Sequence, residues 1–185
     1  MKKILIGLMV LILLVACGKE DYGLGVYGDK QYTNDNFNIK LDITDKFSYL
    51  TDKELKAYNE SVLAASQSPD HDKYFNKVMD LSNTNDTSLV AYVDSRPKVY
   101  KNSLAELNNY LDFLTQQSIN YALKTSTHTL NGVEYDRADL TLDFGYKQTV
   151  LIAVKGDYLL NVQVNYSEGN EEDLDKLLVM LNNNE

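Results

Sequence analysis

The most regular pattern in the chain is the alternation of apolar and polar residues between Lys124 and Tyr166. It predicts four antiparallel strands joined by three two-residue loops, Asn131-Gly132, Gly145-Tyr146 and Gly156-Asp157. Asn-Gly favours a type I′ turn and Gly-X a type II′ turn, and both have a twist that suits a tight hairpin. Because loops of known length fix the strand register, each strand residue can be assigned to one face of the sheet.

One face of this predicted sheet is almost entirely apolar, and we expect a helix to cover it. The face consists of Ala138, Leu140, Leu142, Phe144, Thr149, Leu151, Ala153, Tyr158, Leu160, Val162, Val164 and Tyr166. Such a face is typical of one packed on a hydrophobic core.

The opposite face carries cross-strand polar pairs beside apolar residues. The same register places Lys124 across from Asp139, Ser126 across from Arg137, and His128 across from Tyr135, and it adds Asn161 and Gln163. So many polar groups need water or partners, which indicates that part of this face is solvated. We interpret His128, Tyr135, Arg137 and Asp139 as a candidate binding surface that is at least partly exposed. The alternative is an ordinary solvated face with a cross-strand salt bridge.

Further strands and helices are predicted outside this meander. Alternation predicts strands at Phe37 to Ile43 and at Ser88 to Asp94. Four helices are predicted, because start signals precede apolar residues at helical spacing. The signals are Thr51 with Glu54, Ser68 with Pro69, Ser103 with Glu106, and Asn170. The first helix should end near residue 66 and the second near residue 81. Together these elements predict an α+β fold, an antiparallel sheet with helices packed on it.

The N-terminus reads as an export signal. A short basic segment precedes thirteen apolar residues, Ile4 to Ala16, which are too few for a membrane-spanning helix of about 20 residues. The ending Leu14-Val15-Ala16-Cys17 resembles the lipobox of bacterial lipoproteins, which implies cleavage before Cys17 and attachment of lipid to it. The alternative is an ordinary signal peptide with an incidental cysteine. We therefore predict a signal peptide at 1–16, a lipid-anchored tether at 17–31 and a globular domain at 32–185, held on the outer face of the cytoplasmic membrane.

Charge and cysteine content narrow the set of partners. Removal of the signal peptide takes Lys2 and Lys3 away and changes the formal charge from −9 to −11. An acidic chain of this kind disfavours nucleic acid and other polyanions. Since Cys17 is the single cysteine, the exported domain cannot form an internal disulfide and depends on its core. The expected partners are the membrane, through the anchor, and an envelope protein or small ligand.

Recognisable catalytic patterns are missing from the sequence. It has no glycine-rich phosphate loop, no Gly-x-Ser-x-Gly elbow, no Cys-x-x-Cys pair and no His-Glu-x-x-His motif. Asp70-His71-Asp72 combines metal-ligand types, but adjacent helical positions point in different directions, so we interpret it as the first turn of a helix. We predict no catalytic residue, no metal site and no cofactor.

The order of elements resembles PsbP-like domains, which occur in the extrinsic photosystem II protein PsbP, the import factor Mog and many bacterial lipoproteins. The resemblance lies in Tyr32-Thr33-Asn34, Phe37 to Ile43, Ser103-Leu104-Ala105-Glu106 and the meander from Gly132 to Tyr166. The chain departs from the pattern at Thr44-Asp45-Lys46-Phe47, where relatives often carry a proline and a tryptophan. The resemblance implies an α-β-α sandwich and no enzymatic activity common to the family.

Three classes of function are compatible with these patterns. The first is a non-catalytic, surface-anchored accessory or binding protein, which the anchor and the missing catalytic motifs favour. The second is a metal- or small-ligand-binding module of the envelope. The third is an envelope hydrolase, which the missing nucleophile–base pair disfavours.

Overall fold

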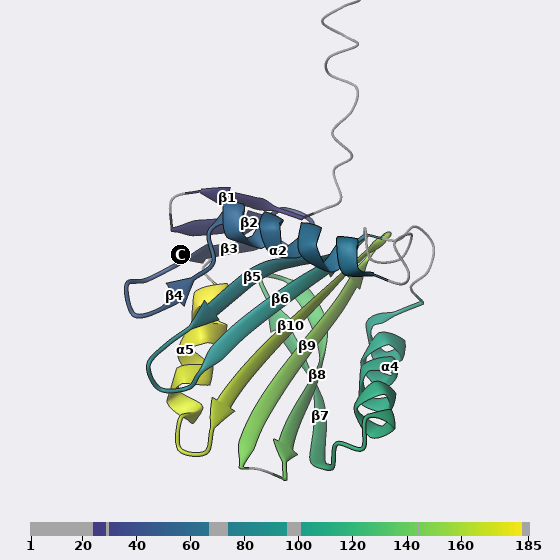
Figure 1. Ribbon diagram of the computed structural model, residues 1–185. Coiled ribbons are helices and arrows are strands. Elements are labelled where there is room, and N and C mark those ends of the chain that lie inside the picture. Colours follow the sequence, from purple (N-terminus) through teal and green to yellow (C-terminus); the bar gives the residue numbers. More distant parts are fainter. Residues whose placement is uncertain (1–23, 29, 67–73, 96–100, 144, 183–185) are drawn as a thin grey trace, which may run out of the picture.

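The computed structural model describes residues 24–28, 30–66, 74–95, 101–143 and 145–182 (Figure 1). In these residues a seven-stranded antiparallel sheet has the order β4-β5-β6-β10-β9-β8-β7, and a three-stranded one has the order β1-β2-β3. The strands are β1 (Val26–Gly28), β2 (Gln31–Asn34), β3 (Ile39–Asp42), β4 (Ser48–Tyr49), β5 (Phe75–Ser82), β6 (Ser88–Asp94), β7 (Tyr121–Leu130), β8 (Val133–Leu142), β9 (Tyr146–Lys155) and β10 (Tyr158–Ser167), and the helices are α2 (Asp52–Ala65), α4 (Ser103–Gln116) and α5 (Glu171–Leu181). The predicted α+β class is confirmed.

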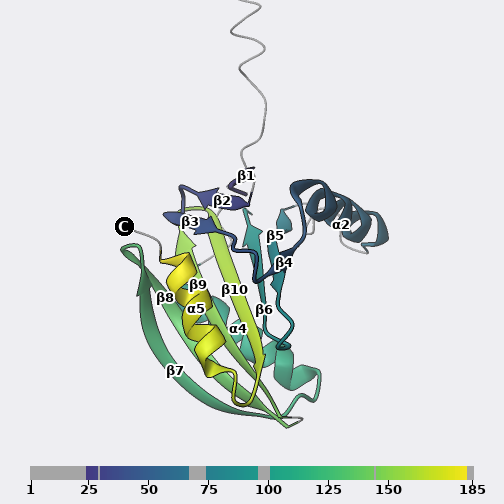
Figure 2. The same ribbon diagram turned by 90° about the vertical axis from the view of Figure 1, so that its left-hand side faces the viewer.

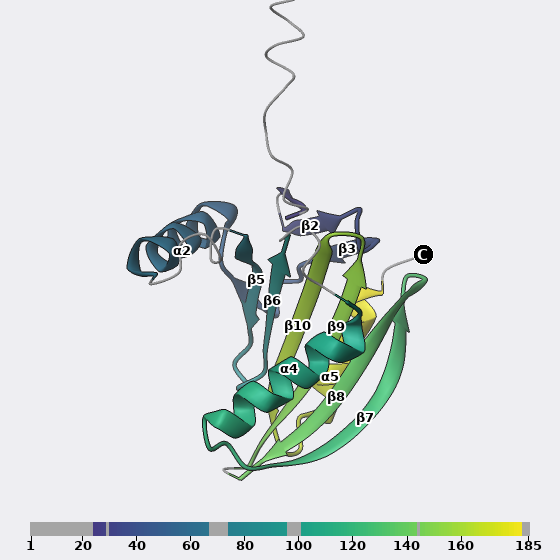
Figure 3. The same ribbon diagram turned by 90° about the vertical axis from the view of Figure 1, so that its right-hand side faces the viewer.

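Helices cover both faces of the large sheet. Figure 2 shows α5 across one face and Figure 3 shows α4 across the other, while α2 lies beside β5 near the sheet edge. Leu107, Leu111 and Leu114 of α4 form one buried cluster with Ala138, Leu140, Val150, Ile152 and Leu159. The leucines of α5 join a larger cluster that includes Leu151, Leu160, Val162 and Val164. The predicted α-β-α layering is therefore present.

Two of the three predicted hairpin loops are confirmed. Leu130 pairs with Val133 across Asn131-Gly132, and both loop residues have positive φ, as a type I′ turn requires. Lys155 pairs with Tyr158 across Gly156-Asp157, and Gly156 has φ 64°.

The predicted loop between β8 and β9 is wrong, and the error exchanges the two faces. β8 ends at Leu142, β9 begins at Tyr146, and the Gly145 N–H donates to the Leu142 carbonyl at 3.1 Å. Leu140 consequently pairs with Gln148, where a Gly145-Tyr146 loop would pair it with Leu151. That shift is an odd number of residues, so it turns each later side chain to the other face. Ala138 and Leu140 face α4, whereas Leu151 faces the α5 side; Phe144 lies outside the described residues.

The predicted helix after Ser68 is also wrong where the structure describes it, because residues 75–82 form strand β5. The pairing of β5 with β6 shifts between Lys77 and Met79, at a bulge. Val78 and Met79 are therefore both buried, although they are consecutive. This break in the alternation produced an apolar spacing that resembles a helix.

The other predicted elements are present, with altered ends. Thr51 and Glu54 form the expected capping box of α2, and the strands around Ile39 and Leu89 are confirmed. Helix α4 begins as expected, but Asn102 is its N-cap and its side chain accepts from the Ala105 N–H at 2.8 Å. The small sheet begins at β1, inside the stretch predicted to be tether.

Asn131 joins three distant parts of the chain. Its side-chain amide donates to the Leu181 carbonyl at 2.8 Å, and its N–H donates to the Asn182 side-chain oxygen at 3.0 Å. Its own carbonyl accepts from the Asn38 side chain at 2.7 Å. The β7–β8 turn thus holds the end of α5 and the loop before β3.

Candidate functional site

The surface predicted from the strand register is present only in part. The predicted pairs of Lys124 with Asp139, Ser126 with Arg137, and His128 with Tyr135 are confirmed. His128, Arg137 and Asp139 are half-buried and thus partly accessible. Tyr135 is completely buried, so its predicted exposure is wrong.

The slipped register explains the burial of Tyr135. This residue lies on the α5 side of the sheet, where it joins the larger core cluster with Leu151 and Ala153. Burial raises the pKa of its hydroxyl, and within the described residues that buried oxygen has no hydrogen-bond partner. Tyr135 therefore belongs to the core and cannot anchor a partner.

The three remaining residues interact mainly among themselves. Arg137 donates from Nε and Nη2 to the Asp139 carboxylate at 2.8–3.0 Å, and Thr149 donates to the same carboxylate at 2.7 Å. Burial, and after it the charge of Arg137, lowers the pKa of His128, whereas Asp139 raises it. With its charges already paired, this patch offers little to a ligand.

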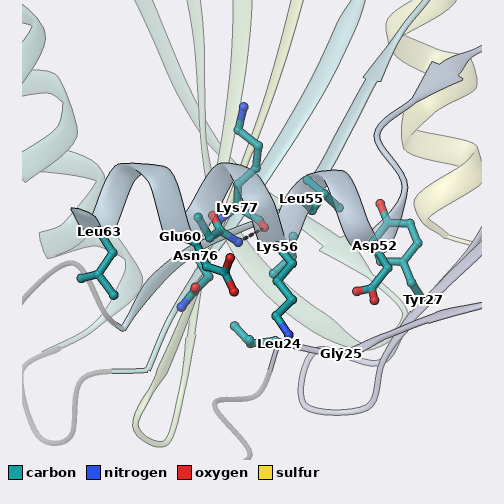
Figure 4. A pocket seen from close by; sticks show the side chains of 12 residues that line it. Leu24, Gly25, Tyr27, Asp52, Leu55, Lys56, Glu60, Leu63, Asn76 and Lys77 are labelled. Atoms are coloured by element: carbon teal, nitrogen blue, oxygen red, sulfur yellow. Dashed lines mark hydrogen bonds between the residues drawn. The ribbon is translucent and has the colours of Figure 1, made fainter. Parts of the chain in front are cut away.

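A cavity of about 340 Å³ lies between α2, β5 and the first described residues of the chain (Figure 4). Its lining combines apolar and polar side chains from these three elements. The lining residues are Leu24, Gly25, Tyr27, Asp52, Leu55, Lys56, Asn59, Glu60, Leu63, Asn76, Lys77 and Val78. The volume is at the lower end of the range usual for ligand sites. Part of the apolar lining remains accessible, since Leu63 is 36% exposed.

Asn59 fixes α2 to the sheet beside this cavity. Its side chain accepts from the Lys77 N–H and donates to the Lys77 carbonyl, both at 2.9 Å. Leu55 is the buried residue of the helix, while Tyr58, Val62 and Leu63 are at least one-third exposed. The hydrogen bonds between Asn59 and Lys77 and the burial of Leu55 thus hold α2 against the sheet, and much of the apolar surface of the helix remains exposed.

The charged residues around the cavity differ in their roles. The Lys77 ammonium donates to Asp80 at 2.8 Å and lies 4.0 Å from the centre of the Tyr58 ring. Burial by itself would lower the pKa of Lys77, but the hydrogen bond to Asp80 and the nearby charges raise it. In Figure 4 its side chain extends away from Lys56 and Leu24. Lys77 therefore contributes to the packing of α2 rather than to the open part of the cavity.

The chain enters the fold at the rim of the cavity, in a conformation that requires glycine. Tyr32 is buried, and its hydroxyl donates to the Leu24 carbonyl at 2.8 Å. Gly25 has φ 77°, and a Cβ there would lie 2.3 Å from the Thr33 carbonyl oxygen. The neighbouring Tyr27 has a raised pKa, caused first by burial and then by Asp80 and Asp52. These contacts fix Leu24 as one wall of the cavity.

The polar side chains that line the cavity are carboxylates, lysines, asparagines and one tyrosine. None of the twelve described residues that line it is a serine, threonine, cysteine or histidine. Across the described residues, no three His, Cys, Asp or Glu side chains gather where they could hold a metal ion. The Asp70-His71-Asp72 cluster and Cys17 lie outside the described residues. Within the described part of the chain, no helix has the length and apolar character needed to cross a bilayer.

The sequence did not predict this cavity, because the residues that line it come from distant segments of the chain. Leu24 lay in the predicted tether, and Asn76 to Val78 lay in a stretch predicted to be helical. The sequence of α2 did contain one signal of it. Val62 and Leu63 continue the apolar positions of the helix beyond Leu55, its buried residue, and this indicates apolar surface that the core does not cover.

Comparison with known proteins identifies the fold. No family model and no curated protein matches the sequence. The solution structure of cyanobacterial PsbP (CyanoP) from Synechocystis sp. PCC 6803 matches with a TM-score of 0.53 and 9% identity, over 90% of this chain and 95% of that one. LpqN, described as involved in cell envelope biogenesis of Mycobacterium tuberculosis, matches with a TM-score of 0.46 and 11% identity, over 78% of this chain and 80% of that one. The match to cyanobacterial PsbP shows that the chain has a PsbP-like fold, as its order of elements led us to expect.

Proposed function

We propose that the protein is a non-catalytic, lipid-anchored binding protein on the outer face of the cytoplasmic membrane. In this proposal the cavity beside α2 takes an apolar group of an envelope protein. The observation that carries it is the position of the cavity at the point where the chain enters the fold, with Leu24 as part of its wall.

The anchor and the cavity are close along the chain. Cys17 precedes Leu24 by seven positions, a stretch that spans at most about 25 Å. Two acyl chains on Cys17 would hold the protein stably on the bilayer. A cavity this near to the anchor is placed to receive a segment of a protein embedded in the same membrane.

The lining supports recognition of an apolar group with a polar surround. Leu24, Leu55, Leu63 and Val78 provide the apolar wall. Asp52, Lys56 and Glu60 on α2 provide charges of both signs around it. An apolar centre inside a polar rim is the usual composition of a protein interface.

The test compares two substitutions on α2. Leu63→Glu places a carboxylate in the cavity, whereas Val62→Glu adds the same charge at the next residue, which is 40% exposed and does not line the cavity. Proteins crosslinked to each full-length variant in intact membranes would be purified and compared. We expect Leu63→Glu to capture at least tenfold less partner than the parent and Val62→Glu to capture the same amount. Both variants should melt within a few degrees of the parent.

Equal capture by the two variants would exclude the cavity as the binding site. Normal melting is essential for this comparison, because a variant that unfolds would lose its partner for a trivial reason.

A further inference from the structure

A second, smaller pocket lies between α4 and the large sheet. It has a volume of about 130 Å³ and is lined by Phe75, Asp94, Glu106, Tyr110, Ile152, Leu159 and Asn161. These residues come from β5, β6, β9, β10 and α4. We call it the Asn161 pocket.

Asn161 is a buried amide with an unused acceptor. It is 8% exposed, and its Oδ1 has no hydrogen-bond partner in the described part of the chain. On neighbouring strands it lies directly across from Tyr92 and Ile152. Buried polar atoms are nearly always partnered, so an exception that lines a pocket points to a ligand that donates a hydrogen bond.

The other polar groups of the pocket are mostly acceptors too. Glu106 is half-buried on α4, and Asp94 is 1% exposed on β6. The Tyr110 hydroxyl donates to the Gln148 side-chain oxygen at 2.8 Å, which commits its proton. None of the seven described residues that line the pocket is Lys, Arg or His. The carboxylate of Glu106 together with the amide oxygen of Asn161 favours a positively charged donor.

One lining residue, Phe75, belongs to an aromatic stack that suits the same ligand. The rings of Phe75 and Tyr92 are stacked with centroids 5.0 Å apart, and Phe75 is 37% exposed. The face of an aromatic ring attracts organic cations. Ile152 and Leu159 are apolar neighbours for the methylene groups that such a cation carries.

We propose that the Asn161 pocket binds an organic cation, the primary ammonium group of an alkylamine. In the bound state the ammonium donates to Asn161 Oδ1 and lies near the carboxylate of Glu106, while its methylenes pack on Leu159. The source of the ammonium is either a lysine side chain of a protein or a free polyamine. This site is independent of the cavity beside α2, so either proposal can fail alone.

The probe is n-butylammonium chloride, added to the detergent-solubilised full chain. Binding would be followed by nitrogen–proton correlation spectra through the backbone amides of Phe75, Leu159 and residue 161. We expect saturable shifts with butylammonium and none with 1-butanol at the same concentration or with sodium chloride at the same ionic strength. Asn161→Leu should weaken binding at least tenfold and Glu106→Gln at least threefold, whereas Glu60→Gln, in the other cavity, should leave it unchanged.

Three results would overturn the proposal. The first is an equal shift with 1-butanol, which would mean that the pocket binds any apolar chain. The second is an unchanged affinity for butylammonium in both the Asn161 and the Glu106 variants. The third is the absence of any saturable shift. Glu106→Gln alters a half-buried helix residue and keeps the test decisive if Asn161→Leu fails to fold. Titration with acetyl-lysine amide and with spermidine then identifies the source, since the tighter of the two marks the kind of amine that the pocket fits.

Discussion

The contacts of Asn131 predict how strongly one turn stabilises the whole domain. Asn131 has φ 51° and donates its side-chain amide to the carbonyl of Leu181, near the end of α5. Asn131→Ala removes that hydrogen bond and leaves a residue in a backbone region that alanine disfavours. Asn131→Gly removes the same bond but tolerates the backbone region.

The two contributions have known magnitudes. A buried hydrogen bond contributes about 1 kcal/mol to the free energy of unfolding, and the left-handed conformation costs an alanine about 1 kcal/mol. We therefore expect Asn131→Ala to lower the free energy of unfolding by about 2 kcal/mol and Asn131→Gly by about 1 kcal/mol. Asp86 is a matched control, because it is exposed and has φ 55°. Asp86→Ala should reproduce the backbone cost alone.

The assay is equilibrium unfolding in urea, with midpoints compared at equal slope. Asn131→Ala should be the least stable of the three variants. If Asn131→Ala and Asp86→Ala had the same midpoint, the bond to Leu181 would contribute nothing. If Asn131→Gly matched the parent, the side-chain bond from Asn131 to Leu181 would not stabilise the domain.

Two further predictions concern the anchor and the pH dependence of stability. Cys17→Ala should release the protein from membranes or leave it unprocessed, and fatty-acid label that persists in this variant would refute the lipid assignment. The hydrogen bond from Asn85, with others from Asn83 and Lys176, lowers the pKa of Asp173 in the folded protein. Because the folded pKa lies below the unfolded value of about 3.9, this stabilisation is complete well above that pH and is lost as the pH falls through the folded pKa. The urea midpoint of the parent should therefore fall more on acidification from about pH 6 to about pH 3 than that of Asp173→Asn, and parallel curves would contradict the assignment.

Local signals in the sequence predicted most of the elements correctly. Thr51 with Glu54 identified the start of α2, and the alternation from Phe37 to Ile43 identified a strand whose apolar residues are all buried. These signals succeed because each is satisfied by neighbours within a few residues. The α+β class followed from them, whereas helices on both faces of the sheet were implied only by the resemblance to PsbP-like domains.

Features that depend on distant contacts were not predicted. The loop between β8 and β9 is one residue longer than the predicted two-residue loop. That single residue changes the register and decides whether Tyr135 is exposed or buried. At β5, a bulge next to Lys77 gave the sequence a helical spacing. The cavity needs three distant segments to meet and the Asn161 pocket needs five elements, and a linear pattern does not contain that information.

The bonds around Asn131 also set an order of events during biogenesis. Asn38 and Asn131 are 93 positions apart, and Asn131 and Asn182 are 51 apart. Contacts of such long range form slowly, because the intervening loops must close first. If the chain is exported from its N-terminus, as proposed above, β1 to β3 would reach the outside before α5. Until α5 follows, the apolar side of the small sheet would lack the cover that this helix gives it, and the chain would be open to proteases and chaperones.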